Sequence, residues 1–214
     1  MEEVRWYFIL YIGAVLLVTI DIVDIIGNTG DALRHSAFQV SSLMTTTGFS
    51  TINYEVWPSF SKGILLLVMF LGGCAGSTAG GIKISRIIIG FKSVAKEVKK
   101  LIHPQRVKIT KMDGKAISDD TTRMVSIYFI IYIAIYVFSL IIISIDNFNF
   151  ETNFTAVAAT LNNIGPGFGE VGPTGNFSAF SHVSKIVLTL DMLIGRLEIF
   201  PMLLLFMPST WKNK

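Results

Sequence analysis

The amino-acid sequence predicts an all-α integral membrane protein. Of its 214 residues, 51% are hydrophobic and only 15% are charged, whereas an ordinary soluble domain is roughly 25% charged. The mean hydropathy is +0.60, and the apolar residues gather in long runs. Residues 124–145 and residues 63–82 contain no Asp, Glu, Lys or Arg. A helix of the first length is about 33 Å long, which is enough to cross the hydrocarbon core of a bilayer.

Two weaker runs bring the number of predicted spans to four. Residues 6–20 form one, which continues towards Ile26 past two aspartates. Residues 186–206 form the other, interrupted by Asp191, Arg196 and Glu198. The single cysteine, Cys74, excludes an intrachain disulfide and a cysteine-cluster metal site.

The basic residues predict the orientation of the spans. Eleven of the 18 Lys and Arg residues lie between Lys83 and Arg123, together with four acidic residues. Basic connections stay on the cytoplasmic side of a membrane. We therefore expect this connection and both chain ends inside, and segments 27–60 and 146–182 outside. Topology explains the basic connection, so no nucleic-acid partner is expected.

Each outward segment contains a short apolar stretch that is typical of a re-entrant helix. Residues 32–44 are introduced by the N-cap residues Asn28, Thr29 and Asp31, and residues 153–161 are introduced by the N-cap residues Thr152 and Asn153. Each stretch runs into a glycine turn and then into a span. The order span, short helix, glycine turn, span therefore occurs twice. The two copies are offset by 117 residues at the glycine turns (48 and 165), and by 123 residues at the following spans (69–72 and 192–195).

The two glycine turns are candidate ion filters. The first is Thr-Thr-Thr-Gly-Phe-Ser-Thr at 45–51, and the second is Asn-Asn-Ile-Gly-Pro-Gly at 162–167. Irregular backbone at membrane depth must line a watery cavity. Its free carbonyl oxygens can replace the hydration shell of a monovalent cation. The alternative is that both are ordinary outer turns, which Gly, Asn and Pro dominate everywhere.

Residues 72–81 hold five glycines inside the second predicted span. At roughly 1 kcal/mol per glycine relative to alanine, the helix is disfavoured there by about 5 kcal/mol. We expect the helix to break into a loop that could obstruct an ion path below the filter. Close glycine packing between helices is the alternative.

Arg196 lies within the last predicted span, where an arginine is costly and marks a functional site by default. Asp191 and Glu198 are five and two residues away, so on a helix they point away from it. We expect its partners to be carbonyl groups of residues 72–81. An ion pair with an acidic residue of another helix is the alternative.

The sequence offers little to support an enzyme. Residues 167–172 match G-x-G-x-x-G, but they follow no predicted strand. The histidines His35, His103 and His182 are scattered, and no metal site or catalytic triad emerges.

Taken together, these motifs resemble those of the Trk/Ktr superfamily of potassium transporters, in particular its TrkH branch. The string Gly-Gly-Cys-Ala-Gly-Ser-Thr-Ala-Gly-Gly-Ile-Lys at 72–83 is the strongest sign. The two glycine turns look like the third and fourth filter segments of that family, and Gly-Arg-Leu-Glu at 195–198 looks like its arginine-bearing last helix. The resemblance implies two span, pore-helix, span repeats of a potassium-channel-like pore, with a broken second span. Residues 1–100 would form the first repeat, 101–120 a cytoplasmic linker and 121–214 the second repeat.

The resemblance also implies a set of functional residues, with potassium as the substrate and no cofactor or other metal bound by this chain. The implied filter residues are Thr46, Thr47, Gly48, Phe49, Asn163, Ile164, Gly165 and Pro166. The implied gate consists of Gly72, Gly73, Cys74, Ala75, Gly76, Ser77, Thr78, Ala79, Gly80 and Gly81, with Arg196 as its positive partner.

The family arranges four repeats around one pore, whereas this sequence holds two. The resemblance therefore implies the C-terminal half of a plasma-membrane transporter, which needs the missing N-terminal half or further copies of itself. It also implies a Trk A-type cytoplasmic nucleotide-binding regulatory subunit, in addition to membrane lipid. A non-transporting scaffold or pseudo-subunit that docks a cytoplasmic partner, and a carrier for an anionic substrate, are the competing functions.

Overall fold

The computed structural model describes residues 1–102 and 110–207, and these residues are mostly helical. The first part contains α1 (Glu2–Ile26), α2 (Thr29–Met44), a 3-10 turn (Tyr54–Val56), α3 (Ser59–Phe70) and α4 (Ile84–Ile102). A small antiparallel hairpin follows, made of β1 (Lys111–Met112) and β2 (Lys115–Ala116). The second part contains α5 (Asp119–Ile143), α6 (Phe150–Leu161), α7 (His182–Leu197) and α8 (Ile199–Phe206), with 3-10 turns at Ser144–Asp146, Gly169–Val171 and Phe177–Ala179.

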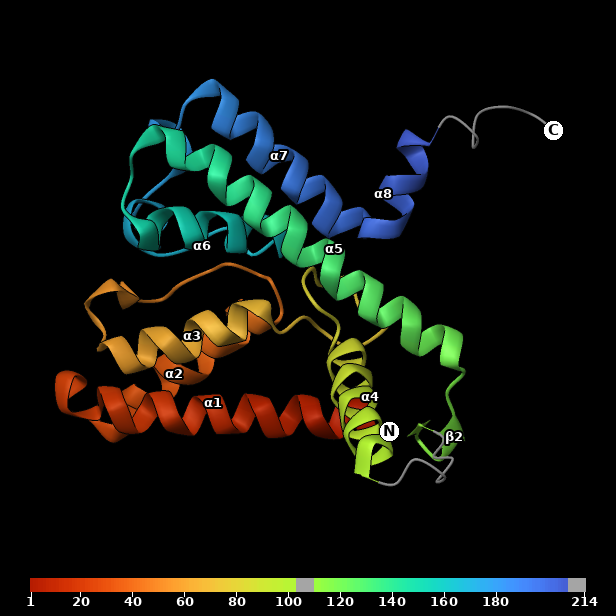
Figure 1. Ribbon diagram of the computed structural model, residues 1–214. Coiled ribbons are helices and arrows are strands. Elements are labelled where there is room, and N and C mark those ends of the chain that lie inside the picture. The colour runs from red at the N-terminus through yellow and green to blue at the C-terminus, as the bar shows by residue number, and fades with distance from the viewer. Residues whose placement is uncertain (103–109, 208–214) are drawn as a thin grey trace.

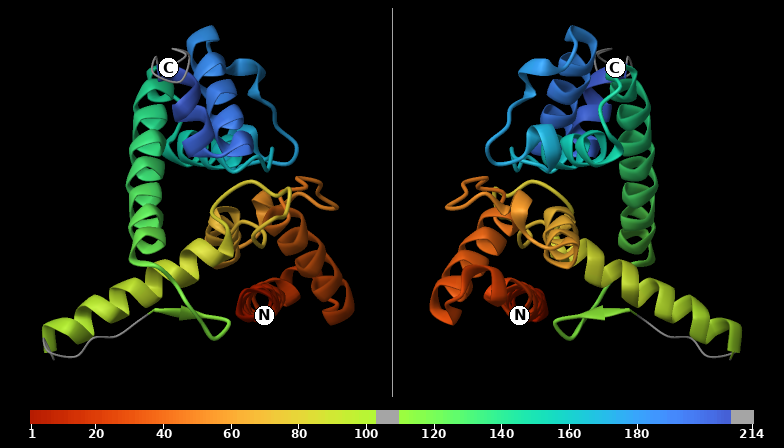
Figure 2. Two further views of the ribbon diagram at one scale, coloured as in Figure 1. Left: turned by 90° about the vertical axis from the view of Figure 1, so that its right-hand side faces the viewer. Right: turned by 90° about the vertical axis from the view of Figure 1, so that its left-hand side faces the viewer.

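The two parts lie one against the other (Figure 1). In the first, α1 packs against α2 and α3, and in the second, α5 packs against α6 and α7. The loop between α3 and α4, residues 71–83, passes between the two parts, as both side views also show (Figure 2). We call this segment the α3–α4 loop. The two ends of the loop are buried between the parts, whereas residues 75–78 are exposed.

The predicted repeat is present in the helix boundaries. Both α1 and α5 have 25 residues, and α5 begins and ends 117 residues after α1. The short helices α2 and α6 end 117 residues apart, and α3 and α7 begin 123 residues apart. The same two offsets, 117 and 123, separate the glycine turns and the following spans in the sequence.

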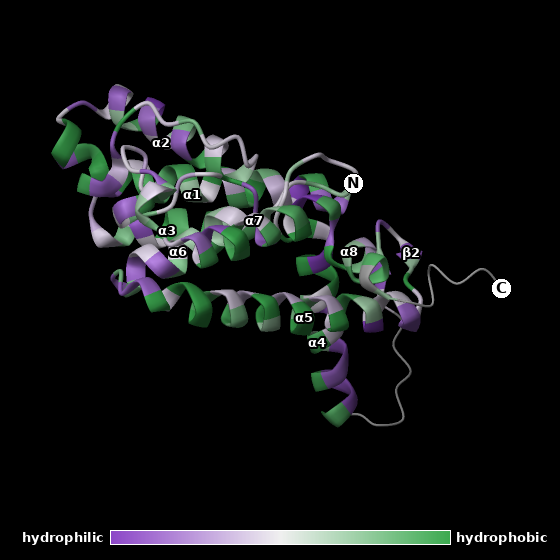
Figure 3. Ribbon diagram, turned by 90° about the horizontal axis from the view of Figure 1, so that it is seen from above, coloured by the Kyte–Doolittle hydropathy of each residue, from purple (hydrophilic) through white to green (hydrophobic). Residues whose placement is uncertain are grey.

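Among the described residues, two helices, α1 and α5, are long and apolar enough to cross a membrane. Only 28% of the apolar window of each is buried inside the chain. Exposed aliphatic and aromatic side chains such as Phe8, Ile12, Ile133 and Phe138 cover their outer faces. Figure 3 shows the hydrophobic colouring along α5. Such surfaces suit contact with lipid or with further protein.

The short helices begin earlier than predicted. Asn28 caps α2, its side chain accepting a hydrogen bond from Gly30 N at 2.9 Å. Asn149, not Thr152 or Asn153, caps α6 and accepts a bond from Thr152 N at 2.8 Å. An asparagine side chain satisfies one of the free N–H groups of a first helical turn, so the helix starts directly after it.

The second predicted span, residues 63–82, breaks as expected. The helix α3 ends at Phe70, and residues 71–83 are not helical. A helix then resumes as α4, inside the basic segment that the sequence analysis treated as a connection. Of the predicted linker 101–120, residues 103–109 lie outside the described residues, and so do residues 208–214 of the predicted second repeat.

The last predicted span, residues 186–206, was wrongly taken as continuous. It divides into α7 and α8 at Glu198, whose backbone has φ 65°. Pro201 gives the physical reason: it lacks the N–H that would bond to the carbonyl group of Leu197, and its ring collides with that carbonyl group in a continuous helix. Pro201 lies in the first turn of α8, where a proline is tolerated.

Candidate functional site

The two glycine turns have the same backbone structure. In the first, four N–H groups bond back to the end of α2: Thr45 to Ser41 O, Thr46 to Leu43 O, and both Thr47 and Gly48 to Ser42 O. In the second, the residues 117 positions later make the same four bonds to the end of α6. The corresponding donor–acceptor distances differ by at most 0.2 Å: 2.9, 3.1, 2.8 and 3.4 Å in the first turn, and 3.1, 3.0, 2.8 and 3.4 Å in the second.

Positive φ angles occur at equivalent places in both turns. Thr46 and Asn163 have φ 56° and 55°, and Gly48 and Gly165 have φ 80° and 109°. The left-handed conformation turns the chain away from the helix that precedes it. The carbonyl groups that follow are thereby released from helical bonding.

The carbonyl oxygens of both turns are largely free. Within the part of the chain that the structure describes, no hydrogen bond is donated to the carbonyl groups of Thr46, Thr47 or Gly48. The same holds for the carbonyl groups of residues 163–166 in the second turn. The carbonyl group of Phe49 differs, because it accepts a bond from Ser42 Oγ at 2.5 Å. Unbonded carbonyl oxygens of this kind can coordinate a cation.

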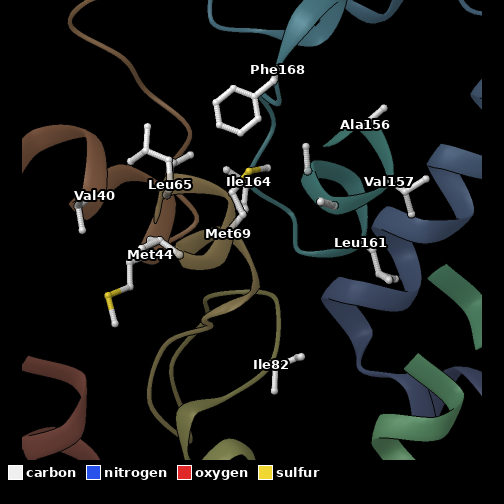
Figure 4. Close-up of a cluster of buried hydrophobic side chains, with 14 of the residues drawn as sticks. Val40, Met44, Leu65, Met69, Ile82, Ala156, Val157, Leu161, Ile164 and Phe168 are labelled. Carbon is white, nitrogen blue, oxygen red and sulfur yellow. The ribbon is translucent and has the colours of Figure 1, made fainter. Parts of the chain in front are cut away.

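The fold brings the two turns together. A Cβ atom on Gly48 would collide with the carbonyl oxygen of Ile164 and would lie 3.1 Å from Cδ of Pro166. Beside this contact, Ile164 and Phe168 belong to the same buried cluster as Leu65 and Met69 of α3 (Figure 4). The first turn therefore packs directly against the second.

Polar contacts near the turns also join the two repeats. The Tyr54 hydroxyl donates to Gly167 O at 2.9 Å, and Gly169 N donates to Glu55 Oε1 at 2.7 Å. Burial, together with the neighbouring Glu55 carboxylate, raises the pKa of the Tyr54 hydroxyl, so it remains a proton donor. Lys62 joins both repeats, since its Nζ lies 2.9 Å from Glu55 and 3.3 Å from Glu151.

The α3–α4 loop lies next to the first glycine turn. Gly80 N donates to Thr46 Oγ1 at 3.2 Å. The base of the loop is closed by backbone bonds, from Gly72 N to Ile82 O at 2.6 Å and from Ile84 N to Gly73 O at 3.3 Å. All ten predicted gate residues, 72–81, belong to this loop.

Arg196 makes the contact that the sequence analysis expected. It is the last residue but one of α7, and its Nη1 donates to the carbonyl group of Thr78 at 2.5 Å. The acidic residues near it have other partners: Glu198 pairs with Arg86 at 2.7 Å, and Asp191 accepts a bond from Ser139 at 2.8 Å. Arg196 therefore holds the loop and not a carboxylate of another helix.

A polar cavity of about 220 Å³ lies beside the loop. Three cationic side chains line it, together with one carboxylate and the loop backbone. The lining residues are Ser77, Thr78, Ala79, Gly81, Lys83, Arg86, Tyr128, Tyr132, Leu161, Ile194, Gly195, Arg196, Glu198 and Ile199.

Sequence reasoning missed two residues that hold the loop, Lys83 and Glu3, and a third beside it, Arg86. Lys83 donates to the loop backbone, and Glu3 of α1 accepts bonds from Ala75 N at 2.7 Å and Ser85 N at 3.1 Å. Arg86 joins the start of α4 to Glu198. Lysine and arginine next to an apolar run were a usable signal, but nothing in the sequence connected Glu3 with a loop about seventy residues away.

Comparisons with known proteins agree with one another. The family model for TrkH, a cation transport protein, matches residues 11–213. The Trk system potassium uptake protein TrkH of Salmonella typhimurium is 40% identical over 181 residues, or 85% of this chain and 37% of that protein. The Trk system potassium uptake protein TrkG of Escherichia coli is 33% identical over 212 residues, or 99% of this chain and 43% of that protein.

The same similarity extends to three-dimensional structure. The crystal structure of the potassium transporter TrkH from Vibrio parahaemolyticus matches with a TM-score of 0.86 and 36% sequence identity. The match covers 98% of this chain and 45% of that one. The chain thus spans less than half the length of each of these relatives.

Proposed function

This chain belongs to the TrkH family of cation transport proteins, and from that membership we propose that it forms half of a potassium-conducting pore in the plasma membrane. The observation that carries the proposal is the matched pair of glycine turns, which present unbonded carbonyl oxygens and contact each other. We assign the filter to residues 46–49 and 163–166. The names of the relatives, potassium uptake proteins, favour transport over a scaffold and over an anion carrier.

A groove on the second repeat supports the view that the ring of repeats continues. The groove has a volume of about 620 Å³ and is lined by Gly165, Lys185, Leu188 and Met192, among others. By the offsets of 117 and 123 residues, these four correspond to Gly48, Lys62, Leu65 and Met69 of the first repeat.

In the first repeat, the corresponding surface is covered by the second repeat. Ile164 lies against Gly48, and Lys62 lies over the ring of Phe168 at 5.7 Å from its centroid. As a result Met69 is 1% exposed, whereas its counterpart Met192 is 47% exposed. A third repeat in the same relation would cover the groove, which fits the share of the relatives' length that this chain spans.

We further propose that the α3–α4 loop is the gate and that Arg196 is its positive partner. The loop lies next to Thr46 of the filter turn and is held by Arg196 from the other repeat. Opening would require residues 77–79 to leave the ion path. The cavity beside the loop offers space for such a movement.

The orientation follows from charge. We place the basic helix α4 and both ends of the described chain on the cytoplasmic side, as the excess of Lys and Arg indicates. A cytoplasmic nucleotide-binding subunit of the Trk A type would meet the protein on this side. Residues 1–100 and 121–214 would then be the two repeats, joined by residues 101–120.

Rescue of potassium-dependent growth tests the proposal. The chain is expressed in cells without potassium importers, first alone and then with the N-terminal half of a TrkH relative, and rubidium uptake is measured in both. We expect rescue with the complementary half. Rescue by the chain alone would show that copies of the chain assemble into the pore. Failure of both, with the protein inserted in the membrane, would contradict a transport function.

A further inference from the structure

Lys83 is a buried cation at the end of the α3–α4 loop. It directly precedes α4, and only 7% of its surface is exposed. A positive charge at a helix N-terminus faces the positive end of the helix dipole, which is unfavourable. A buried ammonium group also requires acceptors for its N–H groups. The groups that Lys83 contacts must therefore compensate for its unfavourable position.

Those groups are carbonyl oxygens of the loop itself. Lys83 Nζ donates to Ser77 O at 2.7 Å and to Ala79 O at 2.8 Å. It also lies 3.4 Å from Ser77 Oγ. Charge-assisted hydrogen bonds of this length are about twice as strong as neutral ones.

The carbonyl group between these two is held by the other cation. Thr78 O accepts the bond from Arg196, so three consecutive carbonyl groups bind two tethered cations. The cations come from different places, Lys83 from the end of the loop and Arg196 from the end of α7. We call residues 77–79 the loop tip.

The loop tip has few other attachments. Within the described ranges, its only other hydrogen bond runs from Ser77 N to Cys74 O at 3.0 Å. The backbone bonds that close the loop involve residues 72, 73, 82 and 84 instead. The position of the loop tip therefore depends on Lys83 and Arg196.

We propose that Lys83 is a positioning residue of the gate. Its ammonium group holds the loop tip in the closed arrangement, because it binds the carbonyl oxygens of Ser77 and Ala79 and is itself fixed to the chain at the start of α4. Removal of the ammonium group frees two of the three carbonyl groups and leaves Arg196 as the only cation on the tip. The inference rests on the proposed function of the α3–α4 loop as a gate.

Cys74 provides a reporter that requires no transport. It is the only cysteine of the chain and lies in the same loop, three residues before Ser77. The modification rate of Cys74 by a cationic methanethiosulfonate reagent is measured in membrane vesicles that contain the full chain and a cysteine-free complementary half. Wild type, Lys83→Met, Lys83→Arg and Lys96→Met are compared, together with rubidium uptake. Lys96 is the matched control, because it lies on α4 but pairs with Asp119 at 2.8 Å, away from the loop.

Lys83→Met loses both charge-assisted hydrogen bonds to the loop tip. We expect it to accelerate the modification of Cys74 by at least about tenfold, the effect of one such bond, and to raise basal rubidium uptake. Lys83→Arg keeps the charge and should stay within about threefold of wild type, since its longer fork can still reach carbonyl oxygens. Lys96→Met should match wild type. An unchanged modification rate in Lys83→Met would overturn the inference.

The two readouts separate this inference from the proposed function. Faster modification of Cys74 without any uptake in wild type would support the tether and contradict transport. Normal rubidium uptake by wild type, with an unchanged rate of Cys74 modification in Lys83→Met, would support transport and contradict the tether. If Lys83→Met does not accumulate in the membrane, accumulation of Lys83→Arg but not of Lys83→Gln supports a tether that depends on the positive charge. Equal accumulation of the two would overturn it.

Discussion

Gly48→Ala tests the contact between the two filter turns. Gly48 has φ 80°, a conformation that costs an alanine about 1–2 kcal/mol. The new Cβ would also collide with the carbonyl oxygen of Ile164 and lie 3.2 Å from its carbonyl carbon. Displacement of packed groups costs roughly 1–3 kcal/mol. The total is about 2–5 kcal/mol, and the displaced group is one of the proposed potassium ligands.

The assay combines stability and selectivity. The thermal midpoint of the purified protein in detergent and the ratio of rubidium to sodium uptake are measured for Gly48→Ala and for Gly63→Ala. Gly63 is the matched control, because it lies in α3 with an ordinary φ and nothing within 4 Å of its added Cβ. We expect Gly48→Ala to lower both quantities, whereas Gly63→Ala should lower neither and could gain up to about 1 kcal/mol.

Gly165→Ala extends the same comparison to the complete pore. Gly165 has φ 109°, but nothing lies within 4 Å of its added Cβ in this chain. In the chain alone the substitution should cost only the conformational part, about 1–2 kcal/mol. With a complementary half in the groove it should cost as much as Gly48→Ala. The reasoning is refuted if Gly48→Ala behaves like Gly63→Ala in both measurements.

Three further substitutions have defined outcomes. Arg196→Gln removes the charged donor to Thr78 O and should raise basal rubidium uptake roughly tenfold; uptake at or below the wild-type level would contradict the role of Arg196 in closing the loop. Tyr54→Phe leaves the buried carbonyl group of Gly167 without its donor and should cost about 1–3 kcal/mol, seen as a lower thermal midpoint; an unchanged midpoint would show that this bond between the repeats contributes nothing. Asn149→Ala removes the cap of α6 and should cost about 1 kcal/mol by the same measurement, with no loss expected if α6 begins elsewhere.

Several features of the fold could be predicted from the sequence because they depend on local chemistry. Uncharged runs predicted α1 and α5, and the five glycines of residues 72–81 predicted the end of α3. The offset between Gly48 and Gly165 is the offset at which the backbone bonds of the two turns repeat. Composition, glycine content and spacing are all properties of the chain in one dimension.

Two boundaries were predicted wrongly although the sequence held a signal. Pro201 marks the break between α7 and α8, but the apolar residues around it concealed the break. Asn149 marks the start of α6, three residues before the position inferred from hydrophobicity. In both cases the hydrogen bonding of one backbone N–H group decided the boundary. Pro201 has no N–H group to donate to the preceding turn, and at the start of α6 the side chain of Asn149 accepts the bond from the N–H group of Thr152.

By itself the sequence determined the membrane class, the internal repeat, the two turns and the expectation that Arg196 meets a carbonyl group of the glycine-rich segment. Only the tertiary structure decided which carbonyl group that is, and that Lys83 holds the neighbouring two. It also decided that Gly48 faces Ile164 across the repeats. The physical reason is that these contacts join residues up to 118 positions apart. In addition, every residue has a carbonyl group, so the sequence does not show which carbonyl group will accept a given bond.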